Sequence, residues 1–242
     1  MTPSEQNNYP LKSFYSKIYK RYDLVNRLFT LGQDKKWRRA AASECVKDKN
    51  RMILDLCCGT GDLLIEILKK APDDTEINGF DFNKNMLSVA QKKINRRKST
   101  SKITLMAGYA DNLPFQDKQF DSIGIAFGFR NLTYKNSQRH AHISEIYRVL
   151  KKGGELVILE SSKPKSRIML LFFTLYVYIF LVLIGSILSG SFKAYWYLAK
   201  SSKEYYSYNE LKTLLEDYGF EIVKNKEFLF GAASLNVAVK KT

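Results

Sequence analysis

The stretch DLCCGTGDLL, residues 55–64, places two cysteines beside two glycines and a threonine. Adjacent Cys57 and Cys58 are poorly spaced for zinc, because metal-binding pairs usually leave a gap of about two to four residues. We interpret both as small buried hydrophobic residues. The glycines indicate other chemistry. Gly59 and Gly61 allow a ligand to approach the backbone, and the helix amides that follow can receive a phosphate or a carboxylate.

An acidic residue lies at the distance that a nucleotide site requires. Asp81 follows the glycine loop by about 20 residues, where an acid can hold both hydroxyls of a ribose. The Gly-Lys-Ser/Thr ending of a P-loop is missing. The loop and Asp81 together predict a site for a nucleoside-containing ligand. The alternatives are a plain structural turn and an aspartate that caps a helix.

A parallel sheet would position these residues, because apolar runs alternate with helical periodicity through the middle of the chain. Strands are expected at 51–57, 75–82, 102–108, 119–129 and 155–162, and helices at 60–71, 83–97 and 137–154, the last ending at a double glycine. Asn83 is the expected N-cap of its helix. A further helix at 207–220 precedes two strands around Gly231, which we expect to pair antiparallel. Ligands of such sheets bind beyond the carboxyl ends of the strands.

The length of 242 residues suits one domain. Four parts are expected: an N-terminal helical cap (1–48), a cofactor-binding core (49–163), an apolar cap insertion (164–206) and a terminal helix with a strand pair (207–242). The polar opening of the chain predicts no signal peptide. The small number of cysteines, 3, is typical of a reducing compartment.

Charge is distributed unevenly. The net charge of +15 favours anionic partners such as nucleic acid, anionic lipid or an acidic ligand. Residues 168–192 carry no charge and are long enough to cross a bilayer. A crossing would separate the last strands from the sheet that begins at residue 51. We therefore expect an apolar cap, or a helix lying on the membrane surface, rather than a span.

Several motifs together resemble a known family. DLCCGTGDL, GFDFNKNMLSVA, ADNLPFQDKQFDSI and RVLKKGGELVILE resemble the class I methyltransferases that use S-adenosylmethionine. More narrowly, YDLVNRLFTLGQDKKWRR, FGFRNL, LESSKP and AYWYLAKS are similar to the quinone-biosynthesis C-methyltransferases that act on demethylmenaquinol and on its ubiquinone-pathway counterpart. The resemblance runs from about Phe14 to the end. It implies an α/β fold: a three-layer, Rossmann-like class I methyltransferase sheet of seven strands with the last antiparallel, N-terminal helices and an apolar cap insertion.

The resemblance also implies a set of cofactor-binding residues. These are Gly59, Thr60 and Gly61 at the methionine portion, Asp81 at the ribose, and Tyr109 and Ala110 at the adenine. Three positions depart from the family pattern. Cys57 stands where many relatives have the first glycine, Tyr109 where Asp or Asn is frequent, and Ala126 where some have serine. Tyr109 is expected to stack on the adenine rather than to bond its amine.

The motif FGFRN supplies the candidate catalytic residues. A ring carbon becomes nucleophilic when a neighbouring hydroxyl loses its proton. Arg130 can stabilise the resulting oxygen anion, and Asn131 can orient a water that takes the proton. The alternative is that Arg130 pairs with a structural carboxylate and Asn131 makes a turn. His140 and His142, at i and i+2, share no helix face, so we expect surface or packing residues and no metal site.

The predicted function is S-adenosylmethionine-dependent C-methylation of a prenylated quinol, demethylmenaquinol to menaquinol. Tyr22, Asp23 and Asn26 are expected to help close the pocket, with simple packing the alternative for Tyr22. Residues 168–192 would offer an apolar surface to the quinol tail. A cytoplasmic enzyme attached peripherally to a membrane surface is expected, with no nucleic-acid partner, and a homo-oligomer is compatible. Alternatives are a ubiquinone-pathway quinol, another small molecule or RNA as substrate, or a non-catalytic membrane-associated protein that binds the cofactor.

Overall fold

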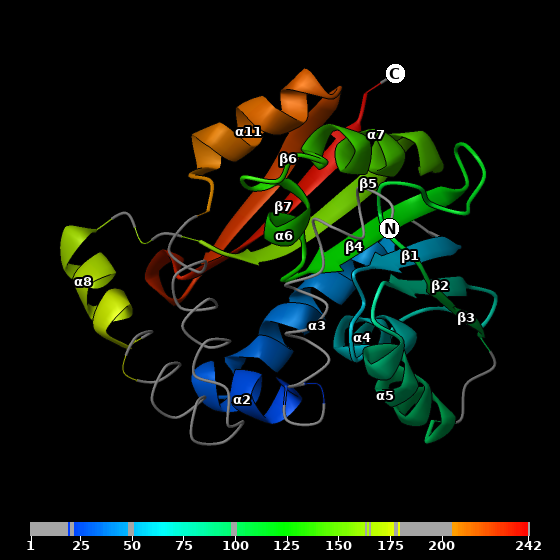
Figure 1. Cartoon of the computed structure of the whole chain (residues 1–242), viewed down its shortest axis with the longest axis horizontal. Coiled ribbons are helices and arrows are strands. Elements are labelled where there is room, and N and C mark those ends of the chain that lie inside the picture. The colour runs from blue at the N-terminus through cyan, green and yellow to red at the C-terminus, as the bar shows by residue number, and fades with distance from the viewer. Residues whose placement is uncertain are drawn as a thin grey trace.

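The computed structural model describes residues 19, 22–47, 51–97, 101–162, 164, 166–176, 179 and 205–241. They form one seven-stranded sheet with helices on both faces (Figure 1). The strands are β1 (Met52–Leu56), β2 (Glu76–Asp81), β3 (Lys102–Ala107), β4 (Phe120–Ala126), β5 (Leu150–Ser161), β6 (Phe220–Phe228) and β7 (Ala233–Lys240). The helices are α2 (Tyr22–Phe29), α3 (Gln33–Cys45), α4 (Asp62–Leu68), α5 (Lys84–Asn95), α6 (Phe129–Thr133), α7 (Arg139–Val149), α8 (Arg167–Tyr176), α11 (Tyr208–Asp217) and the short 3₁₀ turn η3 (Leu229–Gly231).

The sheet has the order β3-β2-β1-β4-β5-β7-β6. Strands β1 to β5 run parallel, and β7 runs antiparallel to both β5 and β6. The apolar side chains of β1 and β5 are buried, as expected for strands covered on both faces. The predicted fold class is therefore confirmed, including the antiparallel last strand and the pairing of the two strands around Gly231.

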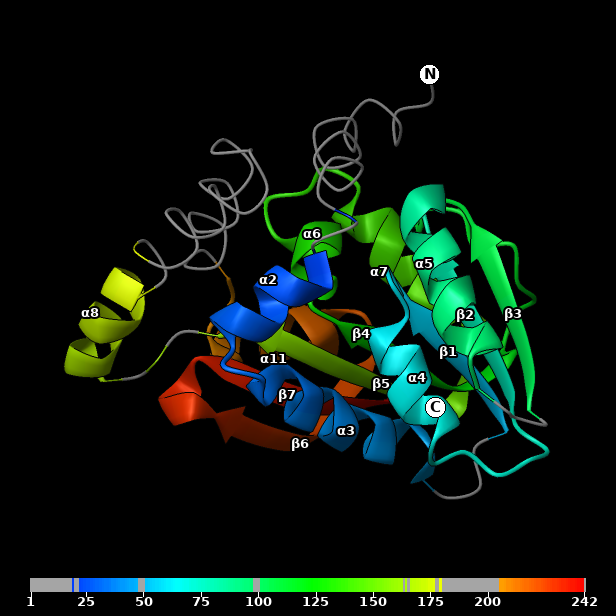
Figure 2. The ribbon, with the colours of Figure 1, turned by 90° about the horizontal axis from the view of Figure 1, so that it is seen from below.

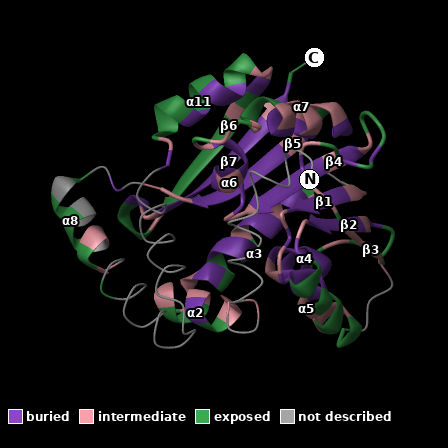
Figure 3. Ribbon diagram, viewed as in Figure 1, coloured by how far each residue is buried: buried purple, intermediate pink, exposed green. Residues whose placement is uncertain are grey.

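Helices cover the sheet in two layers, each with its own apolar core. Helices α3 and α4 pack on one face through a core that includes Trp37, Cys45 and Leu64. Helices α7 and α11 pack on the other face through a core that includes Ile146 and Leu215. Figure 2 shows α3 and α4 on the face turned to the viewer, and Figure 3 shows the buried strands between the layers.

Helix α5 begins at its predicted local signal, whereas α7 ends before the residue that the sequence predicts. The Asn83 side chain accepts hydrogen bonds from the backbone of Asn85 and Met86, which confirms it as the N-cap of α5. The predicted helix over 137–154 is too long, because α7 ends at Val149 and β5 begins at Leu150. Leu150 pairs with Phe120 of β4, so the chain joins the sheet before it reaches the double glycine.

Only part of the uncharged stretch is described. Helix α8 covers its first residues, and positions 177–178 and 180–192 lie outside the described residues. No helix among the described ranges combines the length and apolarity needed to cross a membrane. Helix α8 contacts α2: the Tyr176 hydroxyl donates to the carbonyl of Phe29 at 2.5 Å, and the two rings stack at 5.5 Å.

Two loops at the carboxyl edge of the sheet pack against each other. Cys57, after β1, and Phe127, after β4, both adopt left-handed backbone conformations, with φ of 57° and 59°. This conformation is costly for residues with a side chain. The loops touch at Gly128, where an added Cβ would lie 2.6 Å from the Cβ of Cys57. Cys57 thus adopts a backbone conformation that favours glycine, and Gly128 provides the space for its side chain.

We expect Gly128→Ala to lower the free energy of unfolding by about 1–3 kcal/mol, because it forces overpacking against Cys57. The double variant Cys57→Gly/Gly128→Ala removes the obstructing Cβ and should recover much of that loss. Denaturant unfolding of the wild type, both single variants and the double variant gives the coupling. Additive effects of the two substitutions would contradict this packing.

Candidate active site

The two glycines of the loop have different roles: Gly59 lines the candidate site, and Gly61 packs against a neighbouring helix. Gly59 and Thr60 line a cleft at the carboxyl ends of β1, β2 and β4. Gly61 does not line it. It precedes α4 with a φ of 80°, and an added Cβ would lie 2.9 Å from the Cβ of Ala90 on α5. Gly61 therefore permits α4 to pack closely on α5, and this packing fixes the position of the glycine loop.

The carboxylate of Asp81 joins the glycine loop to the end of β2. It is buried, and its two oxygens accept hydrogen bonds from the backbone amides of Gly59 at 2.9 Å and Asn83 at 2.8 Å. A carboxylate has about four acceptor positions, so each oxygen retains capacity for a ribose hydroxyl. Desolvation raises the pKa of Asp81 to about 6, against the smaller lowering effect of these two amides.

Aromatic and small residues form the far end of the cleft. Tyr109 and Ala110 line it, and the ring of Tyr109 stacks on Phe82 with a centroid distance of 6.2 Å and an interplanar angle of 13°. Ala126 also lines the cleft. The cleft volume is about 80 Å³. Pockets for drug-sized ligands measure roughly 300–1,000 Å³, so binding requires the covering side chains to move apart.

Sequence reasoning missed the role of Asp55 in this cleft. It lies at β1, is 1% exposed, and neither carboxylate oxygen has a hydrogen-bond partner of good geometry within the described ranges. Burial raises the pKa of Asp55, and the nearby amide of Leu64 lowers it. A buried carboxyl group whose oxygens make no hydrogen bond of good geometry to the described residues favours a cationic ligand group. Only the direction of its side chain, which the pattern of residues does not give, could have revealed it.

Helix α2 covers the glycine loop, as expected for Asp23. The Thr60 hydroxyl donates to the Asp23 carboxylate at 2.6 Å, and Lys93 of α5 pairs with the same carboxylate at 2.6 Å. Lys93 also pairs with Asp62 at the start of α4 at 2.5 Å. This network connects α2, the loop and α5. Tyr22 lines the cleft from the same helix, and its burial raises the pKa of its hydroxyl.

A second cavity of about 360 Å³ lies beside the first and is mainly apolar. Arg130 reaches it from α6 and is 7% exposed, yet its Nε and Nη1 have no hydrogen-bond partner in the part of the chain that the structure describes. Its backbone amide donates to the buried carboxylate of Glu160 at 3.2 Å. Glu160 lines the same cavity and was missed by sequence reasoning. The cavity thus combines mainly apolar walls with a buried guanidinium, two of whose nitrogens have no hydrogen-bond partner among the described residues.

The two cavities share a wall. Tyr22, Arg38 and Phe127 line both of them. Arg38 is held by Asp34, its Nη1 lying 2.6 Å from the carboxylate, and its guanidinium lies 5.1 Å from the centre of the Phe127 ring. Of the two candidate catalytic residues, Arg130 faces the apolar cavity, whereas Asn131 lines the cofactor cleft. Arg130 and Asn131 therefore lie on opposite sides of the wall that separates the two cavities.

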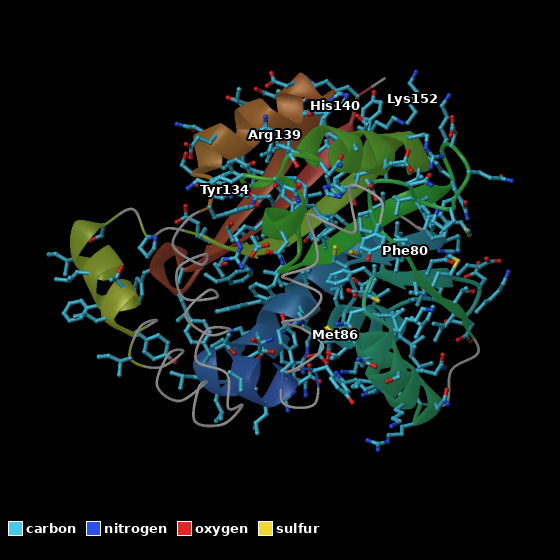
Figure 4. The ribbon with its side chains drawn as sticks, in the orientation of Figure 1. Phe80, Met86, Tyr134, Arg139, His140 and Lys152 are labelled. Atoms are coloured by element: carbon cyan, nitrogen blue, oxygen red, sulfur yellow. The ribbon has the colours of Figure 1, made fainter. Side chains whose placement is uncertain are left out.

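The two histidines lie apart, as their spacing indicates. His140 is exposed beside Tyr218, at the edge of the molecule and away from Phe80 and Met86, which line the cleft (Figure 4). His142 is buried and also lines the cleft. The described residues contain no cluster of metal-ligating side chains.

The strand order and the cleft define a class I methyltransferase that uses S-adenosylmethionine. The residues present fit this ligand: Asp81 for ribose, apolar and aromatic walls for adenine, and Asp55 for a positive charge. A profile of the ubiE/COQ5 methyltransferase family matches residues 1–240. The chain belongs to this family.

Individual proteins agree with this assignment. A demethylmenaquinone methyltransferase of Lactiplantibacillus plantarum is 34% identical over 231 residues, 96% of each chain. One of Bacillus licheniformis is 37% identical over 227 residues, 94% of this chain and 95% of the relative. The magnesium protoporphyrin IX methyltransferase of Synechocystis, solved with bound SAH, has the same fold with a TM-score of 0.67 at 17% identity, covering 96% of this chain and 99% of that one.

Cofactor affinity should fall as the pH is lowered through about 6, the pKa of Asp81. Ribose hydroxyls donate to the ionised carboxylate, so binding favours that form and the protonated form binds less tightly. The limiting slope is about tenfold in the dissociation constant per pH unit. Calorimetric titration with S-adenosylhomocysteine between pH 5 and pH 8, roughly one unit or more on each side of this pKa, measures it.

The matched variant is Asp81→Asn, which preserves shape but does not ionise. It should bind the ligand more weakly at pH 8, about two units above the pKa of the wild-type group, and lose the dependence on pH around 6. A variant that retains the wild-type slope would assign the titration to another group, with Asp55 the first candidate.

Proposed function

We propose that this enzyme methylates a ring carbon of a prenylated quinol, converting demethylmenaquinol to menaquinol. The observation that carries the proposal is the buried Arg130, whose Nε and Nη1 make no hydrogen bond to the described residues, in an apolar cavity that shares a wall with the cofactor cleft. An apolar cavity can bind an isoprenoid-substituted ring, and the guanidinium of Arg130 can stabilise an oxygen anion on that ring. The names of the curated relatives support the same substrate class.

The chemistry requires alignment and removal of one proton. Bound S-adenosylmethionine supplies a methyl group activated by a sulfonium. The quinol hydroxyl loses its proton, the neighbouring ring carbon gains the methyl group and releases its own hydrogen as a proton, and the hydroxyl is restored. Arg130 stabilises the oxygen anion, and a water oriented by Asn131 takes up the proton. Phe127 and Tyr22 line both cavities, and their rings exclude bulk water from the space where the two ligands would meet.

The rim of the apolar cavity suggests where the isoprenoid tail leaves. Four apolar residues of the lining are exposed: Leu31 (74%), Phe172 (62%), Leu229 (50%) and Phe230 (77%). They come from the turn after α2, from α8 and from η3. Exposed apolar groups around a cavity mouth are typical of contact with membrane or protein. We propose that this rim faces a membrane surface in which the tail resides.

Positive charge close in sequence to one rim residue, Leu31, is compatible with an anionic membrane surface. Arg27, Lys35 and Lys36 are exposed near Leu31 in the chain. Each basic residue close to an anionic lipid surface contributes about 1 kcal/mol of attraction. The rival substrate, RNA, is also anionic, but the mainly apolar cavity beside the cofactor cleft favours a quinol.

The quinone profile of cells lacking this protein tests the reaction and the series together. Accumulation of demethylmenaquinone with loss of menaquinone supports the proposal. Accumulation of an unmethylated ubiquinone precursor would assign the ubiquinone series. An unchanged profile would contradict quinol methylation, and binding of S-adenosylmethionine by the pure protein would then favour another substrate.

Arg130→Met should lower turnover about 100-fold, the usual effect of removing one preorganised stabilising group. Because Nε and Nη1 of the buried guanidinium have no hydrogen-bond partner among the described residues, we expect its loss to leave thermal stability near the wild-type value. Affinity for S-adenosylhomocysteine should stay at the wild-type value. The control is Arg39→Met, which removes a surface arginine of α3. Loss of cofactor affinity with normal turnover at saturating cofactor would exclude Arg130 from the quinol site.

Phe230→Asp should raise the Michaelis constant for long-tailed quinols and release the enzyme from anionic vesicles, with a smaller effect on a short-tailed analogue. The added charge opposes burial of the rim in lipid. Val223→Asp is the control, since Val223 is an exposed apolar residue of β6 that does not line the cavity. Kinetics with both substrates and vesicle sedimentation provide the readouts. Equal effects of the two substitutions would contradict a specific rim.

A further inference from the structure

The cofactor cleft contains a buried nitrogen that has no partner. His142 of α7 is 1% exposed, and its Nδ1 lies 2.7 Å from the carbonyl oxygen of Leu132. Its other nitrogen, Nε2, is buried and makes no hydrogen bond within the described ranges. The residue lines the cleft. A buried polar atom without a partner is costly, so a group that fills the cleft and pairs with it gains affinity.

The contact with Leu132 fixes the protonation of the ring. A carbonyl oxygen only accepts hydrogen bonds, so Nδ1 carries the proton. Desolvation lowers the pKa of His142, against smaller raising effects of Leu132 and of the nearby carboxylate of Asp111, and the ring is therefore neutral at physiological pH. Nε2 then carries a lone pair and acts only as a hydrogen-bond acceptor.

His142 lies near the residues expected at the adenine, because the carboxylate of Asp111, which follows Ala110 directly in the chain, acts electrostatically on its ring. Its partner Leu132 and the expected adenine neighbours Tyr109 and Ala110 all line the same cleft. Adenine offers one strong donor on its edge, the exocyclic amine. The Tyr109 ring stacks on Phe82, so this position supplies an aromatic surface and no carboxylate or amide acceptor for that amine.

We propose that Nε2 of His142 accepts a hydrogen bond from the exocyclic amine of the cofactor's adenine, which makes His142 the residue that selects adenine over purines lacking the amine. The inference rests on the assignment of this cleft to the cofactor. A site built around a buried acceptor rejects an analogue without the donor, because the acceptor is then left unpaired.

Calorimetry with two ligands tests the pairing. The probes are S-adenosylhomocysteine and its purine-riboside analogue, which lacks only the amine. The wild type should bind the adenine compound about tenfold more tightly. His142→Phe retains a ring without an acceptor, and it should lose this preference because it binds the adenine compound more weakly. The control His140→Phe, at the exposed histidine, should keep the preference. Wild-type protein without a preference, or His142→Phe with the full preference, overturns the inference.

Nitrogen NMR of the wild-type protein provides a test that needs no variant. The chain has 2 histidines, so the ring signals are readily assigned by comparison with His140→Phe. S-adenosylhomocysteine should move the Nε2 signal of His142 in the direction of an accepted hydrogen bond, and the purine analogue should not. An Nε2 signal that does not respond to S-adenosylhomocysteine overturns the inference about His142. If calorimetry still shows that S-adenosylhomocysteine binds, the assignment of the cleft to the cofactor stands. No binding of either ligand overturns both.

Discussion

The buried carboxylate of Asp81 is the interaction on which the site depends. It holds the amide of Gly59 in one loop and that of Asn83 in the next, so it joins the ends of the neighbouring strands β1 and β2. Helix α4 begins after the first loop and α5 after the second, and they meet where Gly61 packs on Ala90. Without this bridge the glycine loop would lose its side-chain link to the end of β2 and retain the backbone hydrogen bond from the Cys58 amide to the Phe80 carbonyl at 3.1 Å. The same carboxylate lines the cleft. In the proposed assignment it also receives the ribose, so loop order and ribose recognition would share one group.

Local backbone preference is overridden where the two cavities meet. Cys57 and Phe127 are held in left-handed conformations that cost about 1–2 kcal/mol each, and both line the cofactor cleft. The packing of the sheet and helices supplies the energy that maintains them. In return, the chain turns sharply at the ends of β1 and β4, and the wall between the cavities stays thin. Close approach of two ligands requires such a wall.

Much of the fold was predictable because its signals are local. Alternating apolar runs located the strands, Asn83 marked the start of α5, and Asp81 was identified from its distance to the glycines. The end of α7 was not predictable, since it depends on the pairing of Leu150 with Phe120, which lies far away in sequence. The separation of Arg130 and Asn131 between two cavities, like the inward direction of Asp55 and His142, follows from tertiary packing. The composition of the chain and the spacing of its residues do not predict the direction in which a side chain points.

The common wall formed by Tyr22, Arg38 and Phe127 has a thermodynamic consequence. Any ligand that shifts these side chains changes the free energy of binding in the neighbouring cavity, because the same atoms bound both. Linkage makes this effect reciprocal: the factor by which one bound ligand alters the affinity for the other must be the same in either direction. Binding in the two cavities is then cooperative if the movement of the wall favours both ligands, and anticooperative if it favours one at the expense of the other. With cofactor and quinol assigned to the two cavities as proposed, the spent cofactor and the methylated product would each influence how tightly the other is retained.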